Sequence, residues 1–337
     1  MQPLGIICPQ GSDSTSFYRA LGPFTNLFKT EPDFQMIPNI EKISWDVVKM
    51  CSGFFMQRPF TPNHIEMAKV IKSNNKPLWV DFDDDLLAVP TDNPTWKIYG
   101  KDQTKKAVID NLSYADVASF STECLRLKFL SELSKVYPDK KLDTYVIPNA
   151  FDHHLFNYEK KPQRDKFMMW RGSETHLRDL ITYSKEMIEV ANEFPEWTWL
   201  FLGQYPWFMI DHVPEGRFLF QDPLDPIKYF ELLTQIRPSI FLTCLHPSPF
   251  NLGKSSINWQ EGTYAGAAVI APEWPEWTKP GVTTYKTPAE FKSSLISLML
   301  KTPEERDALQ AKSWDAVPDI DSVNKIRWEI VNKYFRK

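Results

Sequence analysis

One stretch of the sequence indicates the fold: Pro249-Phe-Asn-Leu-Gly-Lys-Ser-Ser-Ile-Asn-Trp-Gln-Glu-Gly-Thr-Tyr-Ala-Gly-Ala-Ala-Val-Ile-Ala-Pro272. It begins as a polar loop, continues with helical spacing over Ser256 to Tyr264, and ends in the apolar run Ala268 to Ala271. A continuous apolar run is typical of a strand buried on both faces of a parallel sheet. The stretch therefore predicts one helix-and-strand unit of an α/β protein.

The same alternation extends along the whole chain. Two sets of short apolar runs predict buried strands, at 4–8, 53–56, 78–80, 117–120 and 145–147 and then at 167–170, 199–202, 218–220, 240–242 and 268–271. Helical spacing lies between them at 63–72, 123–134, 179–193, 226–234 and 256–264, and the tail from 288 to 337 has the pattern of three helices. Strands that alternate with helices form doubly wound parallel sheets, so we expect two of them.

Proline and asparagine residues between Pro148 and Pro162 mark the boundary between the two sets of strands. We therefore expect two Rossmann-like domains, residues 1–150 and 151–320, which face a cleft and are followed by C-terminal helices. Parallel sheets bind ligands at the carboxyl ends of their strands. The cleft between the domains is the expected site.

Composition excludes several classes of protein. The chain has 337 residues, a net charge of −4 and 42% hydrophobic residues, and no apolar run of ~18 residues that would span a membrane. Its four cysteines and six histidines lack zinc and redox spacings, so we expect no metal site. Dinucleotide-binding GxGxxG, Walker and GxSxG motifs are absent, which disfavours dehydrogenases, ATPases and hydrolases. The N-terminus does not resemble a signal peptide, so we expect a cytoplasmic protein.

The polar loop in the opening stretch has the features of a phosphate site. Gly253, Lys254, Ser255 and Ser256 precede a helix, whose first N–H groups and dipole attract anions. Glu261 follows about a turn and a half later, where a carboxylate can accept hydrogen bonds from the paired hydroxyls of a ribose. A serine cap beside a solvated lysine and glutamate explains the same residues, and local chemistry leaves both interpretations open.

This stretch resembles the nucleotide-sugar motif in the C-terminal domain of GT-B glycosyltransferases, especially the retaining ones. In that motif a glutamate, followed five residues later by glycine, precedes a short apolar strand, and Glu261, Gly266 and Val269-Ile270 have this spacing. Phe250-Asn251 with Lys254-Ser255 is similar to a variant common in phage-encoded members. The resemblance implies a GT-B fold.

Two other segments of the chain resemble GT-B glycosyltransferases. The segment Val146-Ile-Pro-Asn-Ala-Phe-Asp152 is similar to the interdomain sequence of these enzymes, whose last helix crosses back to the first domain, which implies the same for residues 321–337. Ser16-Phe-Tyr-Arg19 looks like their first acceptor-side loop, which implies acceptor-side roles for Ser16, Tyr18 and Arg19.

The segment Trp170-Arg-Gly-Ser-Glu-Thr-His176 follows the first strand of the second set. In the family a basic residue there faces the donor diphosphate, which implies Arg171, beside Gly172. A guanidinium suits this role because its forked donors match phosphate oxygens. One departure concerns Gly253, which stands where the common pattern has a second glutamate.

Four carboxylates lie in Pro77-Leu-Trp-Val-Asp-Phe-Asp-Asp-Asp-Leu86, at the end of a predicted strand. The other main glycosyltransferase fold uses Asp-x-Asp to hold manganese or magnesium, but it has one nucleotide-binding domain and this chain has the pattern of two. In the GT-B resemblance Asp83 lies about where many retaining relatives carry a histidine beside the reacting sugar. We therefore assign Asp83, and Asp84 after it, to polar contact with the sugar or acceptor hydroxyl, with a capping role as the alternative. Arg58, after another strand, is a candidate for acceptor or phosphate contact.

The resemblance implies transfer of a sugar from a nucleotide diphosphate sugar, expected to be a UDP-sugar, to an acceptor hydroxyl with retention of configuration. Arg171, Lys254 and the amides of Ser255 and Ser256 would hold the leaving diphosphate, so we expect no metal or other cofactor. A non-catalytic protein that binds a nucleotide or glycan is the alternative.

Phage-type relatives glycosylate hydroxymethylated pyrimidines in viral DNA, or other glycans and proteins. Two basic runs, Lys97 to Lys106 and Lys135 to Lys141, lie in the first half and could follow a phosphate backbone, although solvated loop charge is the more ordinary explanation. We expect modified double-stranded DNA as the acceptor, in the host cytoplasm if the protein is phage-encoded. A glycan or protein acceptor stays open.

Overall fold

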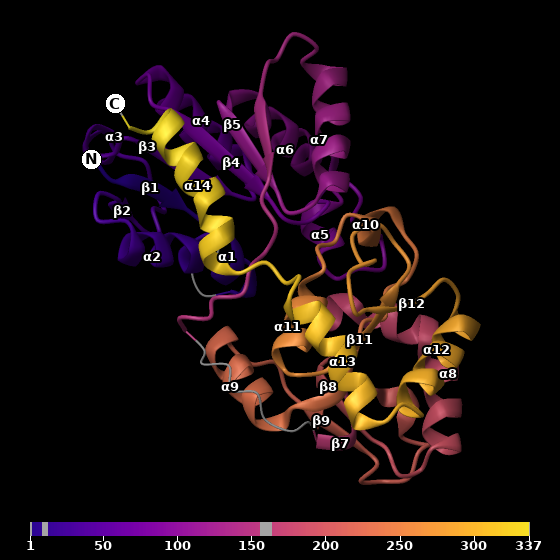
Figure 1. Ribbon diagram of the computed structural model, residues 1–337. Coiled ribbons are helices and arrows are strands. Elements are labelled where there is room, and N and C mark those ends of the chain that lie inside the picture. The colour runs from indigo at the N-terminus through magenta and orange to yellow at the C-terminus, as the bar shows by residue number, and fades with distance from the viewer. Residues whose placement is uncertain (1, 9–12, 156–163, 337) are drawn as a thin grey trace.

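Two parallel six-stranded sheets, one in each half of the chain, form the framework of the molecule (Figure 1). The computed structural model describes residues 2–8, 13–155 and 164–336. In spatial order the first sheet contains β2 (Met36–Ile37), β1 (Leu4–Ile7), β3 (Gly53–Gln57), β4 (Leu78–Phe82), β5 (Val117–Phe120) and β6 (Asp143–Val146). The second contains β12 (Thr283–Tyr285), β11 (Ala268–Pro272), β10 (Pro238–Leu242), β7 (Arg164–Gly172), β8 (Thr198–Gly203) and β9 (Phe218–Gln221). The predicted pair of doubly wound sheets is confirmed.

Helices cover the sheets of both halves. In the first half they are α1 (Ser14–Arg19), α2 (Leu21–Thr30), α3 (Trp45–Met50), α4 (Pro62–Ser73), α5 (Trp96–Tyr99), α6 (Asp102–Tyr114) and α7 (Glu123–Val136). The second half and the tail contain α8 (Leu177–Glu193), α9 (Pro226–Ile236), α10 (Pro249–Leu252), α11 (Ile257–Tyr264), α12 (Pro288–Met299), α13 (Pro303–Trp314) and α14 (Ile320–Tyr334). The three predicted tail helices are confirmed. In the part of the chain that the structure describes, no helix has both the length and the apolar character needed to cross a membrane.

Several helices begin with the same local device. The residue before the helix accepts a hydrogen bond from the third helical N–H, and proline occupies the first turn, as at Thr61, Asp225, Thr287 and Thr302. Proline fits there because the N–H it lacks would have no partner within the helix. These caps place the helix starts close to the predicted positions.

Burial explains why the apolar runs predict strands so well. All five residues of β3, β4, β10 and β11 are buried, because helices cover both faces of each sheet. Large rings such as Trp79, Trp170 and Trp199 fill the space between sheet and helices. Burial of this apolar surface is the main stabilising contribution to each half.

The last helix returns from the second half to the first, where α14 lies along α1 and α2 in Figure 1. Its residues Ile330 and Val331 share a core cluster with Leu4 and Phe24. The side-chain amide of Asn324 donates to the carbonyl of Pro23 at 3.0 Å. The boundaries at residues 150 and 320 stay predictions, and residues 156–163 of the expected linker lie outside the described residues.

Two segments that connect the halves lie side by side. Phe151, on the path to the second half, forms a parallel β-bridge with Asp319, on the path back. The amide of Phe151 donates to the carbonyl of Pro318 at 3.3 Å, and the amide of Ile320 donates to the carbonyl of Phe151 at 3.0 Å. The segment that enters the second half and the segment that leaves it are therefore hydrogen-bonded to each other.

Candidate functional site

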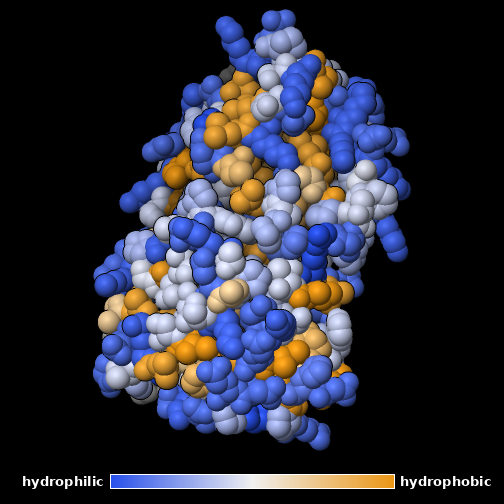
Figure 2. All heavy atoms as spheres, turned by 90° about the vertical axis from the view of Figure 1, so that its right-hand side faces the viewer, coloured by the Kyte–Doolittle hydropathy of each residue, from blue (hydrophilic) through white to orange (hydrophobic). Residues whose placement is uncertain are grey.

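A cavity of about 310 Å³ lies between the carboxyl ends of the two sheets. Arg58, Asp83 and Asp84 reach it from the first half, and Arg171 and Lys254 reach it from the second. On the face in Figure 2 the halves form an upper and a lower lobe, with hydrophilic side chains over much of both. Parallel sheets bind ligands at this edge, so the cavity is the candidate site.

Glu261 lines the cavity from the second half and accepts hydrogen bonds from three side chains. Its side chain is 2% exposed, and it accepts hydrogen bonds from Arg171 Nε at 2.6 Å, Tyr18 Oη at 2.8 Å and Tyr229 Oη at 2.8 Å. Tyr18 belongs to the first half, so this carboxylate joins the halves. A carboxylate has about four acceptor sites, which leaves one for a ribose hydroxyl.

Burial and charge fix the protonation of these groups. Burial raises the pKa of Tyr18 and Tyr229 well above the usual value, and the charge of Glu261 raises both further. Burial alone would lower the pKa of Arg171, but Glu261 and the two phenols outweigh it and raise that pKa. The phenols therefore act as donors, and Arg171 stays charged. Among its described hydrogen bonds only Nε is used, which leaves the two terminal nitrogens for a ligand.

The first half contributes a carboxylate pair held by cations. Arg58 donates to both oxygens of Asp83, and its Nη2 lies 3.2 Å from Asp84 Oδ2. Lys254 Nζ, from the second half, lies 3.3 Å from Asp84 Oδ1. Arg58 has a φ of 45°, in the left-handed region, a conformation that functional sites often hold under strain.

The two carboxylates have different affinities for a proton. The pKa of Asp83 lies above its ordinary value, because burial and the adjacent charge of Asp84 together outweigh the lowering by Arg58 and Arg19. Burial also raises the pKa of Asp84, but Lys254 and Arg58 outweigh it and lower that pKa below its ordinary value. The pKa values of the two adjacent carboxylates are therefore shifted in opposite directions, a pattern that also occurs in sites that move protons.

Two predicted acceptor-side residues do not line the cavity. Arg19 is 1% exposed and donates to both carboxylate oxygens of Asp81, and Ser16 is 1% exposed with its hydroxyl 3.3 Å from Gln57 Oε1. Their polar atoms are thus directed to partners inside the first half. Tyr18 does line the cavity, and the acceptor-side roles of all three residues stay predictions.

The predicted phosphate site at α11 is only partly open. Ser255 lines the cavity, and its hydroxyl accepts a hydrogen bond from Asn149 at 2.9 Å. Ser256 is buried, and both its hydroxyl, at 2.8 Å, and its amide, at 3.3 Å, donate to Glu276 Oε1. A carboxylate of the protein therefore accepts from the groups of Ser256 that were expected to face phosphate, and the predicted role of Ser256 stays a prediction.

Packing explains the departure at Gly253. A Cβ atom on Gly253 would lie 2.8 Å from Leu125 Cδ2, on α7 of the first half. The Gly253 carbonyl also accepts a hydrogen bond from Thr122 Oγ1 at 3.0 Å. The halves touch here, so a side chain at this position would require Leu125 of α7 to shift.

Gly172 lines the cavity, as predicted for a residue beside the diphosphate. A Cβ atom there would lie 2.6 Å from the ring of Trp170. The neighbouring Gly203 has a φ of 96°, and a Cβ atom there would lie 2.4 Å from the Gly172 carbonyl oxygen. Glycine at both positions therefore allows the two strand ends and the Trp170 ring to pack closely in this wall of the cavity.

Sequence reasoning missed several residues that line the cavity, including one on α9 and one just before α8. Tyr229 lies on α9, where its spacing predicts only core packing, and nothing local marks its hydroxyl as a partner of Glu261. His176 also lines the cavity, with Nδ1 2.7 Å from Asp179 Oδ2. His176 follows the first strand of the second half, five residues after Arg171, and this position could have marked it as a cavity residue.

No family model matches the sequence, and no curated protein matches it. Solved structures with a similar fold do. Trehalose-6-phosphate synthase OtsA is 11% identical with a TM-score of 0.62, over 92% of this chain and 74% of that chain. A trehalose-6-phosphate structure from E. coli bound with UDP-2-fluoro glucose is 12% identical with a TM-score of 0.61, over 86% and 75%.

The pneumococcal O-GlcNAc transferase GtfA, in complex with UDP and GlcNAc, is 12% identical with a TM-score of 0.62, over 87% of this chain and 59% of that chain. At these identities the likeness concerns the fold. It agrees with the two facing Rossmann-like sheets described above, and the predicted GT-B fold is confirmed.

Proposed function

We propose that the protein is a glycosyltransferase that moves a sugar from a UDP-sugar to an acceptor hydroxyl. The observation that carries this proposal is the cavity between the sheets, where Arg171 and Lys254 from one half face Asp83 and Asp84 from the other. Donor and acceptor would then bind to opposite walls and meet between them. The similar structures that hold UDP or a UDP-sugar support the choice of donor.

The donor wall has the groups that a leaving diphosphate needs. In this proposal Arg171 presents its terminal nitrogens, Lys254 adds a second positive charge, and Ser255 and Gly172 border the phosphates. Glu261 orients the ribose through its remaining acceptor site. Two fixed cations offset the charge that develops on the diphosphate, so we propose that turnover needs no metal and persists in EDTA.

Asp83 and Asp84 would contact the sugar or the acceptor hydroxyl. Lys254 now pairs with Asp84, so a bound phosphate would have to replace that carboxylate as the partner of Lys254. Arg58 would keep Asp83 in place. We propose retention of configuration, with the leaving phosphate oxygen taking the acceptor proton, and anomeric NMR of the product tests it.

For the acceptor we propose a hydroxymethylated pyrimidine in double-stranded DNA, and hence a phage-type enzyme. The run from Lys97 to Lys106 begins on α5, where Trp96 is 40% exposed and Tyr99 stacks against Phe60 in the first half. The run at Lys135 to Lys141 gives no support, because Lys140 Nζ donates to the Ala115 carbonyl, before β5, at the sheet edge away from the cavity. A glycan or protein hydroxyl is the other acceptor class.

A non-catalytic GT-B protein that binds a nucleotide is the second candidate. Glu276 at Ser256 and glycine at position 253 favour it, because both depart from the expected donor site. Sustained release of UDP would exclude this candidate, and binding without release would favour it.

The test is a turnover and thermal-shift screen with UDP-, GDP-, ADP- and CDP-sugars. Each donor is combined with hydroxymethylated duplex DNA, unmodified duplex DNA or no acceptor. Release of UDP only with modified DNA supports the whole proposal. Stabilisation by a UDP-sugar without DNA-dependent release rejects the DNA acceptor, and absence of both effects rejects the glycosyltransferase.

A further inference from the structure

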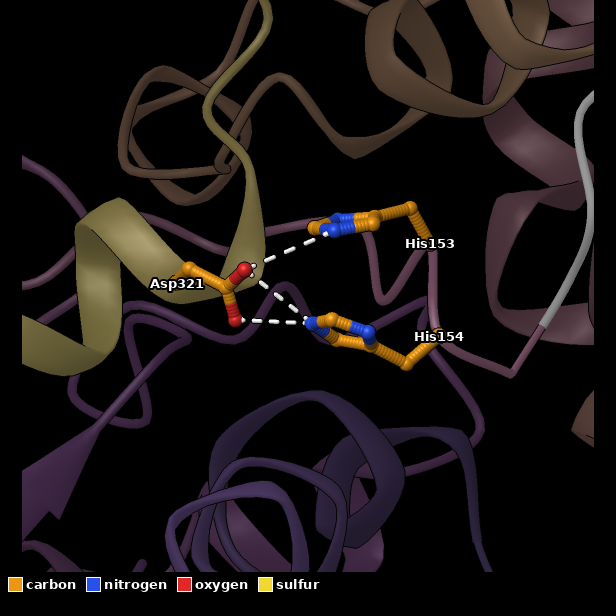
Figure 3. A group of neighbouring side chains, drawn as sticks. All are labelled: His153, His154 and Asp321. Carbon is orange, nitrogen blue, oxygen red and sulfur yellow. Dashed lines mark hydrogen bonds and ion pairs between the residues drawn. The ribbon is translucent and has the colours of Figure 1, made fainter. Parts of the chain in front are cut away.

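A second cluster of reactive side chains lies where the chain crosses between the halves. His153 and His154 follow the bridge residue Phe151, and Asp321 lies in the first turn of α14. The two rings lie one above the other, with centroids 4.0 Å apart, and both point at the same carboxylate (Figure 3). None of these residues lines the cavity between the sheets.

The distances are those of a hydrogen-bonded group that is also compact enough to hold a metal ion. His154 Nε2 lies 2.9 Å and 3.0 Å from the two oxygens of Asp321, and His153 Nε2 lies 3.4 Å from Oδ2. One ligand atom from each residue lies within 4.8 Å of the others. Two ligands bound at 2.0 to 2.1 Å around a tetrahedral zinc ion are about 3.4 Å apart, so the set needs only a small adjustment.

Backbone contacts hold the ligands in position before any ion binds. The bridge between Phe151 and Asp319 fixes the two segments to each other, and Asp319 caps α14 by accepting from the amide of Ser322 at 2.7 Å. In the turn that carries both imidazoles, Asp152 Oδ1 accepts from the amide of His154 at 3.0 Å. Binding would therefore require little ordering of the backbone.

The chemistry of the ligands selects the kind of ion. Two imidazole nitrogens and a carboxylate oxygen suit zinc and its neighbours in the first transition series, whereas magnesium and calcium prefer oxygen ligands only. The side chains of His153, His154 and Asp321 are 41%, 49% and 44% exposed, so ions enter directly from solvent. The same exposure leaves the remaining coordination position to water.

We propose that His153, His154 and Asp321 form a binding site for a divalent transition-metal ion, with zinc as the reference ion. The site joins the segment that enters the second half to the helix that leaves it. Metal bound there stabilises the folded chain, because the unfolded chain separates Asp321 from the imidazoles. The proposal is independent of the proposed transferase activity.

Isothermal titration of tag-free protein with zinc chloride, in a buffer that does not chelate, tests the site. The wild type is expected to bind one zinc ion with micromolar affinity and to melt at a higher temperature in zinc. Removal of one ligand, in His154→Ala or in Asp321→Asn, is expected to weaken binding at least about tenfold. Magnesium chloride is the control titrant and is expected to give no saturable heat.

Matched variants separate this site from other surface residues. His212→Ala removes an exposed imidazole elsewhere, and Asp315→Asn removes a nearby exposed carboxylate, and both are expected to bind zinc as the wild type does. Melting in EDTA confirms that each variant is folded. Unchanged zinc affinity in both His154→Ala and Asp321→Asn, or millimolar binding by the wild type, would overturn the proposal.

Discussion

Glu261 connects the two halves of the molecule through one buried carboxylate. It accepts from Tyr18 of the first half and from Arg171 and Tyr229 of the second. Removing one partner of a buried ion pair leaves a charge without compensation, which is strongly destabilising. Arg171 and Glu261, which form this ion pair, are also the two residues proposed to bind the donor.

The first prediction concerns Arg171. Arg171→Ala is expected to lower kcat/KM for UDP release by about 100-fold or more, because one preorganised donor to a developing negative charge contributes about 3 kcal/mol. Arg178→Ala is the control, since that side chain is 53% exposed and forms its ion pair, within the described residues, with Asp92. If Arg171→Ala turns over at near the wild-type rate, its diphosphate role is refuted.

At the residue scale, sequence patterns predicted several of the side chains that reach the cavity. Arg171, Lys254 and Glu261 all line it. Arg19 and Ser256 do not, because a polar residue in a loop carries no sign of an internal partner such as Asp81 or Glu276. The roles of the cavity residues stay predictions.

At the element scale, His64 in the first turn of α4 has to be neutral, because its Nδ1 atom accepts hydrogen bonds. The Nδ1 atom of His64 accepts from the amides of Phe60 at 3.1 Å and Thr61 at 3.3 Å, and the Thr61 hydroxyl accepts from the amide of His64. This reciprocal arrangement is a capping box. Burial lowers the pKa of His64 to about 4.

The second prediction follows from that pKa. Between pH 6.5 and 4 the unfolded chain binds a proton at His64 that the folded chain does not, so stability falls as pH falls through this window. The contribution is at most about 1.4 kcal/mol per pH unit. Denaturant unfolding at pH 4.5 and 7 is expected to show a smaller pH dependence in His64→Asn, whose amide oxygen still accepts but does not titrate.

The matched control is His212→Asn, which replaces an exposed histidine. It is expected to keep the pH dependence of the wild type. Equal pH dependence in His64→Asn and the wild type would contradict the prediction.

Strands were predicted more reliably than helices, for a physical reason. A strand covered on both faces is mostly apolar, as β3 and β4 are apart from Gln57 and Asp81, and this signal is hard to mistake. The edge strands β2 and β12 were missed because they contain only two and three residues. Helix α6 was missed because its first turn, from Asp102 to Lys105, is polar and hides the buried face that follows.

At the scale of the whole molecule, α14 is part of the first half's core. The third prediction is that Ile330→Ala, at a fully buried position, lowers the free energy of unfolding by about 2 to 5 kcal/mol, through lost contacts and the remaining cavity. Lys325→Ala, on the exposed side of the same helix, is expected to have almost no effect. Denaturant unfolding checks both, and a similar small loss in the two variants would show that α14 only lies on the surface.

The fourth prediction separates contacts between the halves from contacts within one half. Tyr18 and Tyr229 donate to the same carboxylate at the same distance of 2.8 Å, but only Tyr18 comes from the first half. Tyr18→Phe is therefore expected to increase the radius of gyration of the ligand-free protein in small-angle scattering, and Tyr229→Phe is not. An equal change in both variants, or no change in Tyr18→Phe, would contradict this account.

The bridge between Phe151 and Asp319 has a mechanical consequence. A single covalent connection lets two bodies rotate about its axis, whereas two connections bonded to each other resist torsion. We therefore expect the lobes to move by bending across the paired segments and not by twisting about them. A hinge of this kind would bring Lys254 back to the same carboxylate, Asp84, each time the lobes approach.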